Sequence, residues 1–229
     1  MVNTGCVSSR STSFVTLNYY HVFNHAVGGE EIFANDRERR RFLLTLWFYL
    51  PIQPQVRLAH YLGMRPEIQQ ALIKDINSRP RLVKIFAHSL VGNHFHLLVQ
   101  QLCDNGISTY LRRVENSYSK YRNIKYHRKG ALFINPFGAR HITSEEQMLH
   151  VFRYVVINRY SAGFFSKKEM IKEDIWGSLP YYMNRQLDEK KIVDTSFILE
   201  IFNDRDKLLS FVMDQVDYQR TLEGIKHLI

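Results

Sequence analysis

Cysteine is scarce in this chain, and long apolar runs are missing. Its 229 residues include 2 cysteines, Cys6 and Cys103, too few for a disulfide framework or a zinc cluster. No apolar run approaches the roughly 18 residues that a membrane-spanning helix needs, and the first residues lack the apolar core of a secretory signal peptide. These absences argue against secreted disulfide-rich and membrane-spanning proteins, and they predict a protein of the reducing cytoplasm.

Acidic residues are outnumbered by basic ones. The chain has 31 Lys and Arg against 22 Asp and Glu, a formal net charge of +9, which favours a polyanionic partner. Apolar residues make up 45% and charged residues 23%, values typical of globular proteins and not of disordered or fibrous ones. Internal repeats and low-complexity segments are also missing, so we expect one globular domain with appendages.

The order of strand and helix patterns predicts the fold class. Stretches rich in β-branched and aromatic residues indicate strands, and capped segments with an apolar face indicate helices. The order β-α-β-β-α-β-α predicts an α+β fold, a ferredoxin-like or RRM-like antiparallel sheet with helices on one face, plus a mainly helical C-terminal extension. The predicted strands are 15–25, 83–91, 94–100 and one within 131–142, and the predicted helices are 35–50, 106–127, 144–161, 195–202 and 206–216.

Shifts in composition divide the chain. Residues 1–14 are expected to form a polar tail, and 15–165 the domain that contains the sheet. Within it, 51–81 is polar and broken by prolines, which indicates an inserted helical excursion. Residues 166–229 alternate turn signals with short helices and form the C-terminal extension.

Two histidines, His94 and His96, flank Phe95 on a predicted strand. Side chains at i and i+2 point to the same face of a strand, so both imidazoles project together. Two neighbouring imidazoles form half of a divalent-metal site. Chance alone produces about 0.4 His-x-His pairs in a chain of this composition, so an ordinary pair of hydrogen-bonded strand histidines remains the alternative.

Tyr154 and Asn158 form a second constellation on a predicted helix. Residues at i and i+4 share a helix face, so the phenol and the amide oxygen point the same way. The same spacing in Tyr20 and Asn24 has no such meaning, because that segment is predicted as a strand. The structural alternative is that Tyr154 packs in the core while Asn158 caps the helix end.

Together these residues fit a phosphodiester reaction. A phenol with a pKa of about 10 needs a cation that neutralises the phosphate and favours the phenolate. Two imidazoles and an amide oxygen leave coordination positions open for phosphate oxygens and water. The product would be a 5′-phosphotyrosine bond with a free 3′-hydroxyl, which a second strand can reverse without ATP.

Four stretches carry a resemblance to a known family: YHVFNHAV…EIF, LVGNHFHLLV, SYSKYRN and FRYVVINRYSAG. The chain resembles the REP-associated tyrosine transposases, within the wider class of HUH (His-hydrophobic-His) single-tyrosine transposases. The resemblance runs from about Tyr19 to Phe165, with weaker similarity to about Val212. The His-bearing and Tyr-bearing stretches, in that order, are its specific part.

The resemblance implies a metal-dependent single-strand DNA endonuclease and strand transferase that acts at hairpin-associated sites. It implies that His94 and His96 are metal ligands and that Tyr154 is the nucleophile. Asn158 is then the third ligand, and Mg²⁺ or Mn²⁺ is the expected ion. Single-stranded or hairpin DNA is the implied partner.

The chain departs from the family pattern at three points. His25 stands where an arginine is expected, Arg159 follows the asparagine where a proline is usual, and the strand after Gly130 lacks the usual glutamine-arginine pattern. Related insertion-sequence enzymes exchange the tyrosine across a dimer, whereas REP-associated ones act as monomers. The extension beyond Phe165 favours the monomer.

The predicted helix 106–127 is strongly basic. Arg122, Lys125 and Lys129 follow an i, i+3, i+7 pattern, which predicts a basic ridge for a nucleic-acid backbone. A solvated basic face is the alternative. The predicted DNA-binding residues are Arg112, Arg113, Lys120, Arg122, Lys125 and Lys129.

The same helix carries two rival nucleophiles, Tyr118 and Tyr121. The positions four residues further on hold Arg122 and Lys125 and no amide. Tyr154 therefore ranks above both.

Two other functions fit the same residues. The first is a catalytically silent, structured nucleic-acid-binding module derived from a transposase. The second is a zinc hydrolase built on His94 and His96, which requires a third His or acidic ligand, and His88 on the preceding strand is its best candidate.

Overall fold

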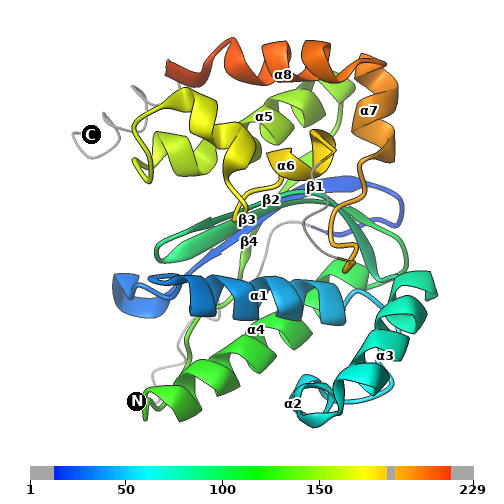
Figure 1. The fold of residues 1–229 in the computed structure, drawn as a ribbon, viewed down its shortest axis with the longest axis vertical. Helices are drawn as coiled ribbons and strands as arrows, with labels where there is room; N and C mark the ends of the chain where they lie inside the picture. Colours follow the sequence, from blue (N-terminus) through cyan, green and yellow to red (C-terminus); the bar gives the residue numbers. More distant parts are fainter. Residues whose placement is uncertain (1–12, 185–188, 218–229) are drawn as a thin grey trace, which may run out of the picture.

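A four-stranded antiparallel sheet forms the centre of the protein. The computed structural model describes residues 13–184 and 189–217. Strand β1 lies between β3 and β4, and β2 and β4 are the edges (Figure 1). This βαββαβ unit is ferredoxin-like and confirms the predicted α+β fold class. The strands are β1 (Tyr19–His25), β2 (Val83–Val91), β3 (His94–Gln101) and β4 (Gly138–Ile142).

Helices cover both faces of this sheet. Helices α1 (Asp36–Phe48) and α4 (Gly106–Lys125), the connections of the βαββαβ unit, share one face as predicted. Helix α5 (Glu145–Ser161) and the helices after it form a second layer on the opposite face (Figure 1). This layer goes beyond the expectation of helices on one face. It forms because the second half of α5 is buried on nearly all sides, so it packs between the sheet and the C-terminal helices.

Side-chain caps define where two of these helices begin. Asn35 accepts a hydrogen bond from the backbone N–H of Glu38 at 3.1 Å, and Ser144 accepts one from the N–H of Gln147 at 3.1 Å. The Gln147 side chain accepts in turn from the N–H of Thr143 at 2.9 Å. These reciprocal bonds satisfy N–H groups that the first turn leaves without partners.

The hairpin between β2 and β3 turns at Gly92 and Asn93, as predicted. Gly92 has a φ of +20°, and a Cβ at this position would lie 2.6 Å from a carboxylate oxygen of Glu31. Only glycine fits this turn without moving Glu31. The turn fixes the register in which β3 presents its histidines.

The excursion between α1 and β2 contains two helices, α2 (Leu58–Gly63) and α3 (Pro66–Ser78). They extend from the side of the α1–α4 layer (Figure 1). The indole N–H of Trp47 on α1 donates to Asn77 at 2.9 Å, and its ring lies 5.9 Å from that of Tyr61. The excursion is thereby joined to the core.

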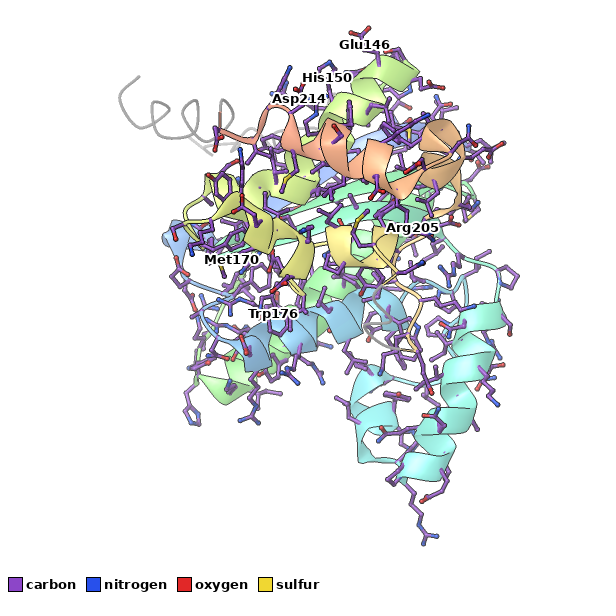
Figure 2. The ribbon with its side chains drawn as sticks, turned by 45° about the horizontal axis from the view of Figure 1, so that its top comes forward. Glu146, His150, Met170, Trp176, Arg205 and Asp214 are labelled. Carbon is purple, nitrogen blue, oxygen red and sulfur yellow. The ribbon has the colours of Figure 1, made fainter. Side chains whose placement is uncertain are left out.

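The segment after α5 covers the free edge of β2. Ser178 bonds the backbone of His88, and the Tyr182 hydroxyl donates to the carbonyl of Phe86 at 2.7 Å. Trp176 of this segment lies against α1, near Arg39 and Arg40 (Figure 2). The edge is thus closed to other strands. The segment after α5 contains the 3₁₀ helix η2 (Lys168–Glu173), α6 (Leu179–Tyr182), α7 (Ser196–Phe202) and α8 (Arg205–Met213). A separate 3₁₀ turn, η1 (Val27–Gly29), follows β1.

The ends of the chain are described only in part. Of the predicted tail 1–14, residues 1–12 lie outside the described residues, and Phe14 packs against Tyr20 with 4.9 Å between ring centroids. Residues 185–188 and 218–229 of the predicted extension also lie outside them. Among the described residues, no helix is long and apolar enough to cross a membrane.

Candidate active site

Four histidines share the face of the sheet that α5 covers. On β3, His94 and His96 project toward this face with their ring centroids 5.0 Å apart. The register of β1 against β3 adds His25, which pairs with His94, and His21. The ring centroids are 4.5 Å apart for His25 and His94, and 5.1 Å apart for His21 and His96. The predicted projection of both β3 imidazoles to one face therefore holds.

His21 contacts His96 directly. Its Nε2 lies 3.0 Å from Nδ1 of His96, a hydrogen bond between the two rings. Burial, with the charge of Arg140 on β4 second, lowers the pKa of His21 to about 4. His21 is therefore neutral near pH 7.

Tyr154 lies above these rings. Its ring centroid is 5.3 Å from that of His96 at an interplanar angle of 89°, and 5.7 Å from that of His21. Tyr154 is half-buried, whereas Asn158, one turn later, is 4% exposed. The Oδ1 of Asn158 accepts a hydrogen bond from Ser89 at 3.4 Å, and Ser89 pairs with His96 across β2 and β3. The structure thus brings the phenol, the amide and the histidines to one face within a single chain.

Phe23 fills the space between the histidines of β1. Its ring centroid lies 5.2 Å from that of His21 and 5.9 Å from that of His96. Gly138 on β4 pairs with Phe23, and a Cβ at this glycine would approach the Phe23 ring to 2.4 Å. The missing side chain of Gly138 therefore leaves room for the Phe23 ring.

The donor groups at this face are mainly imidazole nitrogens. The described residues contain no group of three or more His, Cys, Asp or Glu side chains arranged to hold a metal ion, so the four imidazoles do not converge on one point. An ion bound by His94 and His96 would need a different third donor. The amide oxygen of Asn158, which accepts a hydrogen bond from Ser89 beside His96, is one nearby donor among the described residues.

His88 does not complete a zinc site, which corrects the suggestion made for a zinc hydrolase. It pairs with Leu97 across β2 and β3, and Leu97 faces the opposite side of the sheet from His96, because neighbouring strand residues alternate. His88 is fully buried, and neither ring nitrogen has a hydrogen-bond partner. Burial, with the charge of Arg159 second, lowers its pKa to about 4.

Comparison with known proteins supports the fold. No family model and no curated protein sequence matches the chain. A solved structure of a REP-associated tyrosine transposase bound to a REP hairpin matches with a TM-score of 0.51 and 13% sequence identity, over 82% of this chain and 93% of that chain. The chain has the fold of a REP-associated tyrosine transposase. The resemblance drawn from the sequence motifs is confirmed at this level.

Within this transposase fold, the rival tyrosines lie on the other side of the sheet. Tyr118 is fully buried, and its hydroxyl donates to the carbonyl of Ile32 at 2.6 Å. Burial, with the charge of Glu38 second, raises its pKa far above the ordinary value. The Tyr121 hydroxyl lies 3.3 Å from Glu38. Both phenols belong to the α1–α4 layer and face away from the histidines.

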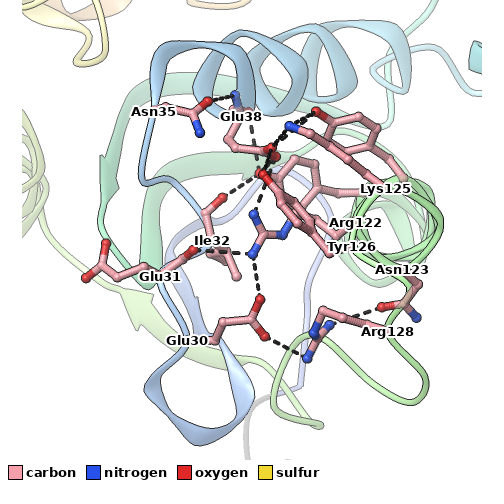
Figure 3. Close-up of polar contacts among 12 residues, drawn as sticks. Glu30, Glu31, Ile32, Asn35, Glu38, Arg122, Asn123, Lys125, Tyr126 and Arg128 are labelled. Atoms are coloured by element: carbon pink, nitrogen blue, oxygen red, sulfur yellow. Dashed lines mark hydrogen bonds and ion pairs between the residues drawn. The ribbon is translucent and has the colours of Figure 1, made fainter.

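Glu38 is the centre of a charged network between α1 and α4 (Figure 3). Its side chain is fully buried, pairs with Lys125, and accepts a hydrogen bond from the Tyr126 hydroxyl at 2.7 Å. Arg122 lies 3.7 Å from Glu38 and 2.5 Å from Glu30. Burial alone would raise the pKa of Glu38, but the hydrogen bonds and charges of Lys125, Tyr126 and Arg122 outweigh it and lower the pKa.

The six predicted DNA-binding residues of α4 and the following turn therefore divide into two sets. Arg122 and Lys125 neutralise acids inside the transposase fold. Arg113 donates to the backbone carbonyls of residues 51 and 52. The predicted ridge of Arg122, Lys125 and Lys129 is thus not one continuous exposed surface. The three exposed members are Arg112, Lys120 and Lys129.

Arg159, one of the three departures from the family pattern, joins α5 to the C-terminal segment. It is 5% exposed, its Nε pairs with Asp174 at 2.8 Å, and it donates to the carbonyl of Leu90 on β2. The arginine at this position therefore stabilises the packing of α5 against the C-terminal extension.

Sequence reasoning missed His21 and Arg140 as parts of the site. His21 contacts the predicted ligand His96, and Arg140 pairs with His21 across β1 and β4. The signal was present, because His21 and His25 have the even spacing that places strand side chains on one face. Only the pairing of β1 with β3 shows which face this is.

Proposed function

We propose that this protein is a transposase that cleaves and rejoins single-stranded DNA at hairpin-associated sites, with Tyr154 as its nucleophile. The observation that carries the proposal is the edge-on contact between the Tyr154 and His96 rings inside one chain. The similar structure, a REP-associated tyrosine transposase bound to a REP hairpin, supports the same class of activity.

In the proposed step, the Tyr154 oxygen attacks a DNA phosphorus and loses its proton. The bond from phosphorus to the 3′ oxygen breaks, and that oxygen takes up a proton as a free 3′-hydroxyl. A 5′-phosphotyrosine ester remains on the protein. Attack by a second 3′-hydroxyl reverses the step and transfers the strand, with one phosphodiester broken for each one made.

His94, His96 and Asn158 would hold the divalent ion. Their donors fit such an ion, and a nitrogen-rich set suits Mn²⁺ better than Mg²⁺, which prefers oxygen ligands. A bound ion would neutralise the phosphate and favour the phenolate. The hydrogen bond from Ser89 would orient Asn158 as the third donor in this proposal.

Arg140 would bind DNA phosphate at the same face. It is exposed and pairs with His21 on the neighbouring strand. The exposed cations Arg112, Lys120 and Lys129 lie on the other side of the sheet, so in this proposal they contact DNA outside the reaction site.

A covalent-adduct assay tests the proposal. The protein is incubated with a labelled hairpin DNA that carries a single-stranded flank, with Mn²⁺ or with EDTA, and adducts are separated on a denaturing gel. We expect an adduct that needs Mn²⁺ and disappears in Tyr154→Phe. Tyr160→Phe, which removes a hydroxyl from the same helix at a residue bonded to Asp217, is the matched control and should keep the adduct.

The outcomes separate the functions considered. An adduct that survives in Tyr154→Phe would assign a different nucleophile and contradict the proposal. Hairpin binding without any adduct in the wild-type protein would instead identify a catalytically silent nucleic-acid-binding module. Mn²⁺-dependent cleavage without a protein–DNA bond would indicate an activated water.

A further inference from the structure

A groove on the side of the sheet away from Tyr154 is lined by cations. It has a volume of about 780 Å³ and lies between α1, α2 and α4. No acidic residue is among the residues that line it. Its six basic residues are Arg37, Arg41, Arg57, Arg113, Lys120 and Lys125.

Three of these basic side chains are exposed to solvent and are not neutralised by an acidic residue of the described chain. Arg37, Arg57 and Lys120 are exposed and form no ion pair within the part of the chain that the structure describes. Lys125, by contrast, pairs with Glu38, and Arg113 donates to backbone carbonyls. Arg37 belongs to α1, Arg57 directly precedes α2 and Lys120 belongs to α4, so the positive charge surrounds the groove.

The rest of the lining is apolar or aromatic. Leu62 of α2 is 41% exposed and Ile124 of α4 is 78% exposed, both unusually accessible for large aliphatic side chains. The ring of Tyr121 also lines the groove and lies 5.0 Å from the guanidinium carbon of Arg41. Cations around an apolar floor suit a ligand that offers phosphates and flat apolar surfaces together.

We propose that this groove binds an unpaired segment of nucleic acid. Phosphates of a single strand would lie on Arg37, Arg57 and Lys120, and its bases on Tyr121, Leu62 and Ile124. A duplex offers the groove only phosphates, because its bases are stacked inside, whereas an unpaired strand offers both. Binding here requires no cleavage, so the inference does not depend on the phosphotyrosine chemistry.

The excursion 51–81 gives the groove its third wall. Arg57, Leu58 and Leu62 come from this segment, and without it α1 and α4 alone would leave the groove open. The excursion thus has a function in this account: it makes a second nucleic-acid surface on the face away from the histidines.

Fluorescence anisotropy with a labelled 12-nucleotide single strand and the matching duplex tests the groove. The groove variant is Arg57→Gln with Lys120→Gln. Its control is Arg65→Gln with Lys74→Gln, which removes the same charge from exposed residues outside the groove. We expect ~10- to 100-fold weaker single-strand binding for the groove variant only, with a salt slope reduced by about 1.4, the value for two lost phosphate contacts.

A second variant tests the apolar floor. Ile124→Ser with Leu62→Ser should weaken single-strand binding several-fold without changing the salt slope or the weaker duplex binding. Equal losses in the groove and control variants, or duplex binding as tight as single-strand binding, would overturn the inference. Photo-crosslinks from thiothymidine should map to peptides of α1 and α4; crosslinks confined to β3 and α5 would also overturn it.

Different experiments test the Tyr154 reaction and the binding of nucleic acid in the groove, so either proposal can fail without the other. Tyr154→Phe should retain the groove crosslinks while losing the covalent adduct. A groove variant that still forms the adduct on a short substrate but loses the α4 crosslinks supports both accounts at once.

Discussion

The imidazoles of His21 and His96 share one hydrogen bond, with 3.0 Å between Nε2 of His21 and Nδ1 of His96. A hydrogen bond between two imidazole nitrogens holds a single proton, which either ring can donate. When His96 donates it from Nδ1, the Nε2 of His96 keeps the lone pair that a cation needs. His21 then acts as a positioning residue for the candidate ligand.

His21→Phe tests this role. Phenylalanine keeps a ring in place but removes the hydrogen bond, so we expect Mn²⁺ affinity, measured by titration calorimetry, to fall by ~10- to 100-fold. His150→Phe removes an exposed histidine of α5 (Figure 2) and should leave the affinity unchanged. A His21→Phe protein that binds Mn²⁺ as tightly as wild type would show that the bond does not orient His96.

His88 should make the folded protein sensitive to acid. Its pKa of about 4 lies below the ordinary value of 6.5, so between these pH values the unfolded chain binds a proton that the folded chain does not. Its contribution to stability is therefore complete above pH 6.5 and falls, by up to about 3 kcal/mol, as pH drops toward 4. His88→Leu removes the effect and two buried nitrogens without partners.

Urea unfolding at pH 7.5 and pH 5 measures this difference. We expect the stability of His88→Leu relative to wild type to increase at the lower pH. His21, with a similarly lowered pKa, leaves a residual slope in the variant. A constant difference between the two proteins at both pH values would show that His88 is not kept neutral.

Glu38→Gln should destabilise the fold strongly. The change leaves the buried guanidinium of Arg122 and the ammonium of Lys125 without their shared carboxylate. Removal of one partner from a buried ion pair costs about 3–5 kcal/mol. Glu146→Gln, at an exposed residue of α5 (Figure 2), should change the free energy of unfolding by less than about 0.5 kcal/mol. Similar effects of both changes in chemical unfolding would contradict a structural role for the network.

Gly138→Ala should disturb the site through Phe23. The new methyl group would overlap the Phe23 ring, which must then move against His21 and His96. We expect a loss of about 1–3 kcal/mol in stability and a lower adduct yield. Gly63→Ala meets nothing within 4 Å and is the control. Unchanged aromatic chemical shifts for Phe23 in the Gly138→Ala protein would rule out this coupling.

Local signals predict much of this fold. The hairpin at Gly92 and Asn93 follows from a turn pair between apolar runs, and the start of α5 follows from the Ser144 cap. Such features depend on residues within a few positions of each other, which a sequence displays directly. The resemblance to the transposases also depends on such short stretches.

Contacts between distant segments account for what the sequence does not reveal. Arg122 and Lys125 have the spacing of an exposed ridge, but Glu38, more than eighty residues earlier, turns them inward. His88 seemed a possible ligand because only the strand register places it on the far face. His21 joins the site for the same reason. The sequence shows the charge and spacing of a side chain, but the pairing of strands and the packing of helices determine which residues it contacts.

The bond between Arg159 and Asp174 has a consequence for assembly. It joins the end of α5, which carries Tyr154, to the segment after α5. That segment is itself hydrogen-bonded along the edge strand β2 of the same sheet. Exchange of α5 with a second copy of the chain would first require this segment to separate from β2. In the proposed function we therefore expect each chain to keep Tyr154 beside its own His94 and His96, with no exchange of the tyrosine across a dimer.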